Sequence, residues 1–258
     1  MSVARLVFVF CLTFLSAAAC AQQPGTSTYE PTVGQEGKDV VWVPTPQALV
    51  DKMLDMAKLT PNDFLMDLGS GDGRTVITAA KRGARALGVE YNPQMVELSK
   101  RNAQKEGVAE RAQFMKADLF ETDFSKATVI TMFLLPDINL KLRPKLLQLK
   151  PRTRVVSNSF TMGDWQADET AELSSSQGCT NSWCTALLWI VPARVAGTHK
   201  TPQGDITFKQ QYQMLSGTLR TAERTVPLEG RVRGEEITFK AGGREYRGRM
   251  NGKQLELK

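Results

Sequence analysis

Apolar and polar residues alternate along the chain with two periods, one typical of helices and one typical of strands. Between residues 63 and 160, short apolar runs that stop at glycine or polar residues alternate with segments of helical periodicity. This alternation predicts βαβ units, and therefore an α/β fold with a doubly wound parallel sheet covered by helices on both faces. Strands are expected at 63–69, 84–91, 112–119, 128–135 and 152–160, and helices at 73–83, 92–107 and 136–149.

The pattern differs on either side of this region. Residues 43–59 carry a helical apolar stripe, with Thr45 as the expected cap and Pro46 in the expected first position. Residues 205–258 alternate apolar and polar side chains between turn signals such as Gly242-Gly243. They predict a small antiparallel β module at the C-terminal end.

The first 21 residues have the layout of a secretory signal peptide. Arg5 precedes an apolar run at 6–15, and small residues follow. Cleavage at Ala19-Cys20-Ala21 is preferred, whereas a lipoprotein attached at Cys20 and an uncleaved anchor are the alternatives. No other stretch is long and apolar enough to cross a bilayer, so no transmembrane segment is expected after cleavage. The sequence predicts export to the bacterial periplasm or cell envelope.

Charge is distributed unevenly over the predicted parts of the chain. These parts are the signal peptide (1–21), a linker (22–43), the α/β domain (44–193) and a basic β module (194–258). The chain has 258 residues and a net charge of +6, and the module alone holds 13 basic and 7 acidic residues. An anionic partner would explain this excess, but a solvated strand face explains it more simply.

Few residues are available for metal or hydrolytic chemistry. His199 is the one histidine of the sequence, which argues against a Ser-His-Asp hydrolase and against a histidine-rich metal site. Signal removal would leave Cys179 and Cys184, too few with one histidine for a structural zinc site. A local disulfide is favoured over two buried free thiols, since an oxidising compartment permits it. No metal is predicted.

A glycine-rich turn follows the first strand of the α/β region. It reads Asp67-Leu68-Gly69-Ser70-Gly71-Asp72-Gly73-Arg74, and its glycines allow a ligand to approach the backbone closely. The dinucleotide pattern would need a glycine where Arg74 stands, which disfavours an NAD-linked enzyme. The carboxylates of Asp67 and Asp72 suit a cationic amino group better than a pyrophosphate. This charge favours S-adenosylmethionine, whose amino acid end carries an ammonium beside a sulfonium.

Two further acidic residues end the next strands. Glu90 closes the second strand, where a carboxylate can accept hydrogen bonds from ribose hydroxyls. Asp118 closes the third, where it can accept from the adenine amino group, and Leu119 beside it can pack on the ring. The expected cofactor residues are thus Asp67, Gly69, Ser70, Gly71, Asp72, Gly73, Glu90, Asp118 and Leu119.

The ordered set DLGSGDG, VEYNP and KADLF resembles the class I, seven-strand S-adenosylmethionine-dependent methyltransferases, over residues 43–192. That resemblance implies a Rossmann-like sheet and S-adenosylmethionine as cofactor. The stretch VWVPTP, together with DLGSGDGR, resembles the lysine methyltransferases that act on the c-type component of the mitochondrial ATP synthase. This second likeness implies a protein amine as methyl acceptor.

The fourth strand ends in Phe133-Leu134-Leu135-Pro136-Asp137, without the N/D-P-P-Y/F motif of enzymes that methylate adenine or glutamine. DNA adenine is therefore not expected as a substrate. The residues expected at the acceptor entrance are Pro136, Asp137, Asn139 and Trp165, with a surface loop as the alternative interpretation for them. Methyl transfer depends mostly on alignment, so no catalytic base is assigned. An exported protein that binds the nucleoside without turnover is the alternative function.

Overall fold

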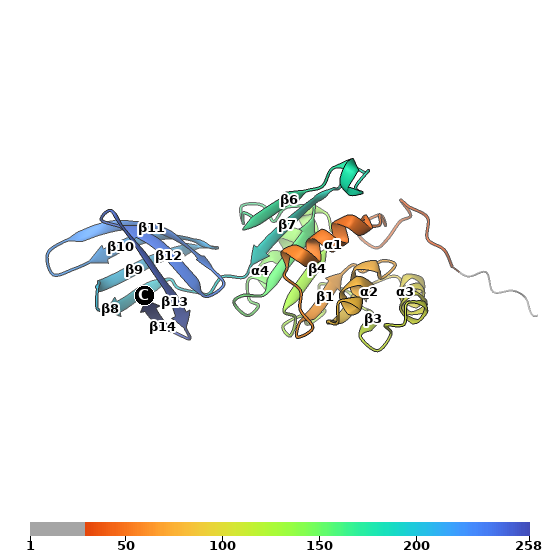
Figure 1. The fold of residues 1–258 in the computed structure, drawn as a ribbon, viewed down its shortest axis with the longest axis horizontal. Coiled ribbons are helices and arrows are strands. Elements are labelled where there is room, and N and C mark those ends of the chain that lie inside the picture. Colours follow the sequence, from red (N-terminus) through yellow and green to blue (C-terminus); the bar gives the residue numbers. More distant parts are fainter. Residues whose placement is uncertain (1–28) are drawn as a thin grey trace, which may run out of the picture.

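The computed structural model describes residues 29–258, so the predicted signal peptide and the Cys20 site lie outside the described residues. Two seven-stranded sheets follow one another along the chain and lie end to end in an elongated molecule (Figure 1). Within residues 29–258, every helix falls short of the length and apolar character needed to span a membrane.

The first sheet has the strand order β3-β2-β1-β4-β5-β7-β6. Its first five strands run parallel to their neighbours, as the alternating pattern predicts: β1 (Phe64–Leu68), β2 (Arg85–Glu90), β3 (Ala112–Lys116), β4 (Val129–Met132) and β5 (Arg154–Asn158). The sequence did not predict the last two, β6 (Glu169–Glu172) and β7 (Thr185–Ile190), which are antiparallel to each other. β7 also pairs antiparallel with β5, and this pairing places the start of β7 beside the carboxyl end of β5.

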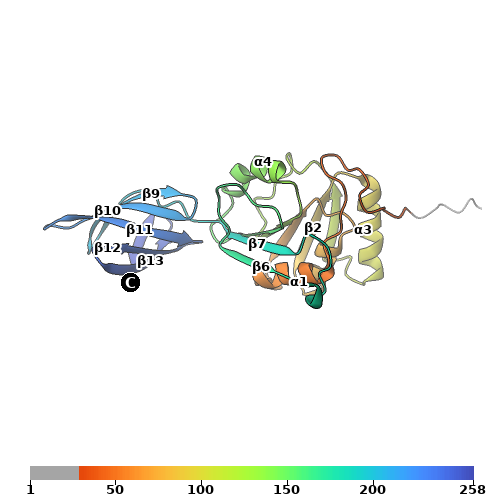
Figure 2. The same cartoon turned by 90° about the horizontal axis from the view of Figure 1, so that it is seen from above.

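Helices cover both faces of this sheet. α1 (Gln47–Met56), α2 (Arg74–Lys81) and α3 (Pro93–Lys105) share one core with alternate strand residues such as Leu65. α4 (Pro136–Leu146) packs on the other face, with Met66 and Leu68. Figure 2 shows α1 and α4 on opposite sides. The doubly wound α/β prediction is therefore confirmed.

The predicted cap of α1 is wrong. The helix begins after Pro46, and no side chain caps it. The carbonyl oxygen of Thr45 instead accepts a hydrogen bond from Arg74 at 2.9 Å, and its hydroxyl accepts one from Asn158 at 3.3 Å. Tertiary contacts thus occupy both polar groups of Thr45.

The second sheet is an antiparallel meander, as predicted for the C-terminal module. Its strands lie in chain order: β8 (Gly197–Thr201), β9 (Gly204–Gln211), β10 (Met214–Arg220), β11 (Thr225–Arg233), β12 (Glu236–Ala241), β13 (Arg244–Asn251) and β14 (Gln254–Leu257). β14 returns to contact β8, so the sheet is nearly closed into a barrel. The alternate residues Phe208, Leu228 and Phe239 fill its interior.

Arginines of the module bind carboxylates of the protein itself. Arg231 pairs with Asp168 at 2.7 Å, and Arg233 pairs with Glu169 at the edge of the first sheet. Two others pair within the module, Arg247 with Glu245 and Arg249 with Glu256. Much of the basic excess therefore serves internal ion pairs, two of which join the two sheets.

Candidate active site

A cavity of about 620 Å³ lies at the carboxyl edge of the first sheet. The ends of β1, β2, β3 and β4 form its floor, which is where ligands bind in open α/β sheets. Residues 35–45, called the strap below, form another wall. The sequence placed most of the strap in a linker and did not connect it with the site.

The turn between β1 and α2 has the backbone that its glycines permit. Gly69 and Gly71 both have positive φ, +78° and +53°, and both line the cavity. A Cβ on Gly71 would lie 2.7 Å from Nε1 of Trp42 in the strap. Gly73, at φ +84°, precedes α2 and is not among the lining residues, because it packs against Phe114. The turn thus brings backbone to the cavity through its first two glycines.

Asp67 is a buried carboxylate at the end of β1. Thr131 on β4 donates a hydrogen bond to it at 2.7 Å. Burial, reinforced by the nearby Glu90 and Asp72, raises the pKa of Asp67 to about 7, although the Thr131 bond acts in the other direction. A cation placed beside this carboxylate would stabilise its charged form.

Asp72, the other carboxylate of the turn, already has a partner. The Arg74 guanidinium donates to both of its oxygens, with Nη2 to Oδ2 at 2.6 Å. Asp72 lines the cavity but its charge is balanced, so Asp67 is the carboxylate left to attract a cation.

Glu90 and Asp118 both line the cavity, and their oxygens have different partners. The two oxygens of Glu90 accept the backbone N–H groups of Gly71 and Asn92, at 3.0 and 2.9 Å. These bonds orient the carboxylate and leave it further lone pairs for hydroxyl donors. Asp118 binds the ammonium of Lys38 from the strap, and this contact lowers the pKa of Asp118.

A hydrogen-bonded turn holds the strap over this acidic part. The N–H of Gly34 donates to the carbonyl of Trp42 at 2.8 Å, and the N–H of Trp42 donates to the carbonyl of Gln35 at 2.9 Å. The Lys38 ammonium also lies 4.8 Å from the ring centre of Tyr91, a cation–π contact. Lys38 and Trp42 are therefore site residues that no local signal in the sequence marked.

The other part of the cavity is aromatic. Phe133 follows β4, and its ring stacks on Phe160 beyond β5 with centroids 5.8 Å apart. Trp183, just before β7, meets Phe133 edge-on at 6.1 Å. The carboxyl edge of the sheet thus divides into an acidic half at β1–β3 and an aromatic half at β4, β5 and β7.

The residues expected at the acceptor entrance lie around this aromatic half but not on the cavity wall. Pro136 and Asp137 form the first turn of α4. Asn139 is buried behind the wall and donates to the carbonyls of Phe160 and Thr161, each at 3.2 Å. The fourth, Trp165, is fully buried in the core between Trp189 and Tyr212. The neighbouring residues Leu135 and Ile138 line the cavity in their place.

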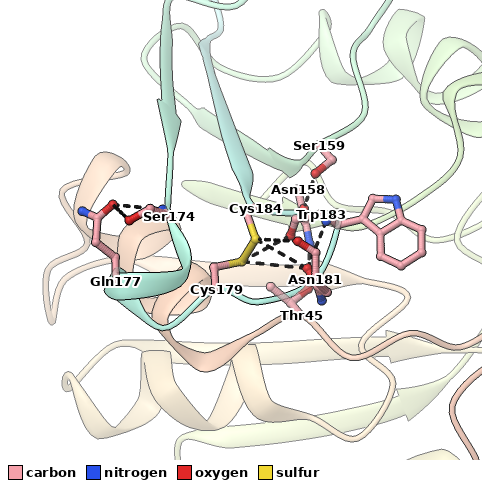
Figure 3. Close-up of a disulfide and its surroundings, with 9 residues drawn as sticks. All are labelled: Thr45, Asn158, Ser159, Ser174, Gln177, Cys179, Asn181, Trp183 and Cys184. Atoms are coloured by element: carbon pink, nitrogen blue, oxygen red, sulfur yellow. Dashed lines mark hydrogen bonds between the residues drawn. A yellow bond between two sulfur atoms is a disulfide. The ribbon is translucent and has the colours of Figure 1, made fainter.

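A disulfide joins Cys179 to Cys184 in the loop between β6 and β7 (Figure 3). The same loop carries Trp183, whose N–H donates to the side chain of Asn181 at 3.0 Å. Within residues 29–258, no three histidine, cysteine or acidic side chains gather as they would to hold a metal ion.

Comparisons with known proteins agree with this geometry. The ANTKMT methyltransferase domain family matches residues 67–169. A protein-lysine N-methyltransferase from Saccharolobus islandicus is 42% identical over 164 residues, which are 62% of this chain and 96% of that protein. The human lysine N-methyltransferase named for the c-type component of ATP synthase is 36% identical over 49% of this chain and 54% of its own length.

A solved structure is also similar. It is described as an RNA methyltransferase from Salinibacter ruber in complex with S-adenosyl-L-homocysteine. The two chains are 46% identical, with a TM-score of 0.55, over 59% of this chain and 96% of that one. These matches cover the first sheet and its helices rather than the whole chain.

The cavity suits the same cofactor. Within the described residues, the hydroxyl of Ser70 is buried at the cavity and has no hydrogen-bond partner, and Asp67 has no cationic partner. A ligand that carries both a positive charge and polar groups would satisfy them. The cofactor is S-adenosylmethionine, and the chain belongs to the family of the Saccharolobus protein-lysine N-methyltransferase, within the class I S-adenosylmethionine-dependent methyltransferases.

Proposed function

We propose that this methyltransferase modifies the side-chain amine of a lysine in a protein. The observation that carries the proposal is the division of the carboxyl edge into an acidic half and an aromatic half. The acidic half suits a cationic cofactor, and the aromatic half suits the alkyl chain of an acceptor. The names of the similar lysine methyltransferases support the same acceptor class.

The acidic half would hold the cofactor residue by residue. Asp67, with the backbone at Gly69 and Gly71, would receive the amino acid end. Glu90 would accept the ribose hydroxyls through the lone pairs that Gly71 and Asn92 leave free. Asp118 and Leu119 would receive the adenine, and Lys38 would have to release Asp118 for this contact.

The aromatic half would prepare the acceptor amine. When bound, S-adenosylmethionine supplies a methyl group on a positively charged sulfur that an uncharged amine can attack. The apolar rings of Phe133, Phe160 and Trp183 disfavour an ammonium, so they lower the pKa of an amine placed among them. Rigid walls also restrict the approach of the amine to one direction. No basic side chain is required for either effect.

Transfer of a labelled methyl group tests the acceptor class. Purified protein and tritiated S-adenosylmethionine are incubated with a cell-envelope extract, which is then divided and treated with protease or with ribonuclease. Protease-sensitive label that yields methyllysine on acid hydrolysis is the expected result, and Asp67→Asn is the inactive control. Ribonuclease-sensitive label would overturn the lysine proposal in favour of RNA. Cofactor binding without any transfer would overturn it in favour of a binding protein.

We further propose that the protein acts outside the cytoplasm, in the periplasm or cell envelope. The apolar run at residues 6–15 and the Cys179–Cys184 disulfide support this location, because disulfides persist in oxidising compartments. Mass spectrometry of the mature protein from fractionated cells tests it. A chain that begins at or after Cys20, recovered from the envelope fraction, is expected. An intact Met1 in the cytoplasmic fraction would contradict export.

A further inference from the structure

The loop that carries Trp183 has little support other than its disulfide. Among residues 174–182, only Cys179 is buried, and the rest are exposed. Trp183 directly precedes Cys184, so the covalent bond restrains the backbone one residue away from the indole. Figure 3 shows the indole extending away from the sulfur atoms. Exposed polar loops of this kind are mobile unless something restrains them.

The other two aromatic walls are held by the sheet itself. Phe133 comes directly after β4, a strand between two parallel neighbours. The carbonyl of Phe160 accepts hydrogen bonds from Asn139 at 3.2 Å and from the hydroxyl of Ser157 at 2.8 Å. The amide of Trp183, by contrast, is held by Asn181, a member of the same exposed loop. Only the disulfide ties this part of the loop to the buried Cys179.

We propose that the Cys179–Cys184 disulfide is a clamp that makes Trp183 the specificity-determining wall of the acceptor entrance. The clamp holds the indole against Phe133 and so keeps the slot narrow enough for an unbranched alkyl amine. The cofactor half is formed by other strands and does not depend on it. The lysine-specific part of this inference rests on the proposed function, whereas the clamp itself does not.

Kinetics with a lysine probe tests the clamp. The acceptor is a pool of dodecapeptides with one central lysine, and a pool with central norleucine is the blank. Trp183→Ala and the double variant Cys179→Ala/Cys184→Ala should each raise the acceptor KM, by about two- to tenfold if an aromatic contact is lost. Affinity for S-adenosylhomocysteine, measured by calorimetry, should stay unchanged. Trp183→Phe should recover part of the loss, and Ser176→Ala, in the exposed part of the loop, should have no effect.

The triple variant separates a clamp from two unrelated effects. If the disulfide acts through Trp183, the KM of Trp183→Ala should not rise further when both cysteines are also replaced. Multiplied effects in the triple variant, or an unchanged KM in the cysteine variant, would overturn the proposal. Equal losses of cofactor affinity would overturn it too, because they would indicate general damage to the fold.

Hydrogen exchange of the wild-type protein decides the question even if lysine is not the acceptor. A phosphine reductant converts the disulfide to two thiols and takes up an oxygen from water, so it opens the loop without a mutation. Faster amide exchange at residues 180–186, with unchanged exchange in β1 and β2, is expected after reduction. Unchanged exchange at 180–186 would overturn the clamp. If wild-type protein transfers no methyl group to the peptide pool, the lysine proposal fails and this exchange result still tests the clamp.

Discussion

The ammonium of Lys38 lies 2.5 Å from the carboxylate of Asp118, although 80 residues separate them in the chain. This ion pair connects the strap to the strand end that is proposed to receive adenine. It raises the pKa of Lys38 and lowers that of Asp118, so both groups are charged near neutral pH. The strap and the cofactor therefore compete for one carboxylate.

Removal of Lys38 should tighten cofactor binding. Lys38→Met leaves Asp118 without its ammonium, so the adenine amino group no longer has to displace it. Because the pair is partly exposed to solvent, the gain in affinity for S-adenosylhomocysteine should be modest, about two- to fivefold by calorimetry. The difference should shrink at high salt. Lys116→Met, on an exposed position of β3, is the matched control, and weaker binding by Lys38→Met would contradict the competition.

Cofactor affinity should depend on pH through Asp67. Because the pKa of this carboxyl is raised to about 7, the cofactor-free protein holds it protonated at lower pH. The ionised form should bind the cationic cofactor, so affinity should rise about tenfold per pH unit between pH 5 and 6.5 and level off above 7. Thr131→Val removes a hydrogen bond to the charged form and should move the midpoint upward by about one unit. A binding curve independent of pH would contradict this role.

The same carboxyl affects stability with the opposite dependence on pH. In the unfolded chain Asp67 has a pKa near 3.8, and in the cofactor-free native protein it is about 7. Between these values the native state binds more protons, so the free energy of unfolding should fall as pH rises through this window. Asp67→Asn should flatten that part of the profile, measured by urea unfolding without cofactor. Stability that rises from pH 4 to 7 through Asp67 would contradict the raised pKa.

Gly73 should tolerate a side chain poorly. It combines a positive φ of +84° with close packing, because a Cβ there would lie 2.8 Å from the Phe114 ring. Gly73→Ala should therefore lower the free energy of unfolding by about 2–4 kcal/mol, from backbone strain and overpacking together. Gly107→Ala is the matched control, because its φ is +69° and nothing lies near its Cβ position. It should cost only about 1–2 kcal/mol, and equal losses in urea unfolding would contradict the packing argument.

Arg231 should matter more for stability than other arginines of the β module. Its partner Asp168 is almost fully buried, with 1% side-chain exposure, and also accepts the N–H of Ile190. Arg231→Ala leaves that carboxylate underpaired and should cost about 1–3 kcal/mol in denaturant unfolding. Arg247→Ala, which breaks an exposed pair with Glu245, should cost less than about 0.5 kcal/mol. Similar losses in both variants would contradict a structural role for the junction.

Local patterns were sufficient for the acidic half of the site. Asp67, Glu90 and Asp118 each follow an apolar run, and each run is a strand of the parallel sheet or leads directly out of one. Parallel strands end at the same edge, so recognition of the strands placed the three carboxylates together without a structure. The β module was equally predictable, because residues that alternate apolar and polar around tight turns form neighbouring antiparallel strands.

The aromatic half and the strap depended on contacts between distant residues. Ala186 pairs with Asn158 because β7 returns antiparallel beside β5, and this return brings Trp183 to the cavity. Trp165 was expected at the entrance, yet burial of its large apolar ring between Trp189 and Tyr212 places it in the core. The sequence by itself therefore determined the strand ends, since hydrophobic periodicity is local. Only the tertiary structure decided which loops cover those ends, because that choice depends on strand order, long-range pairing and burial.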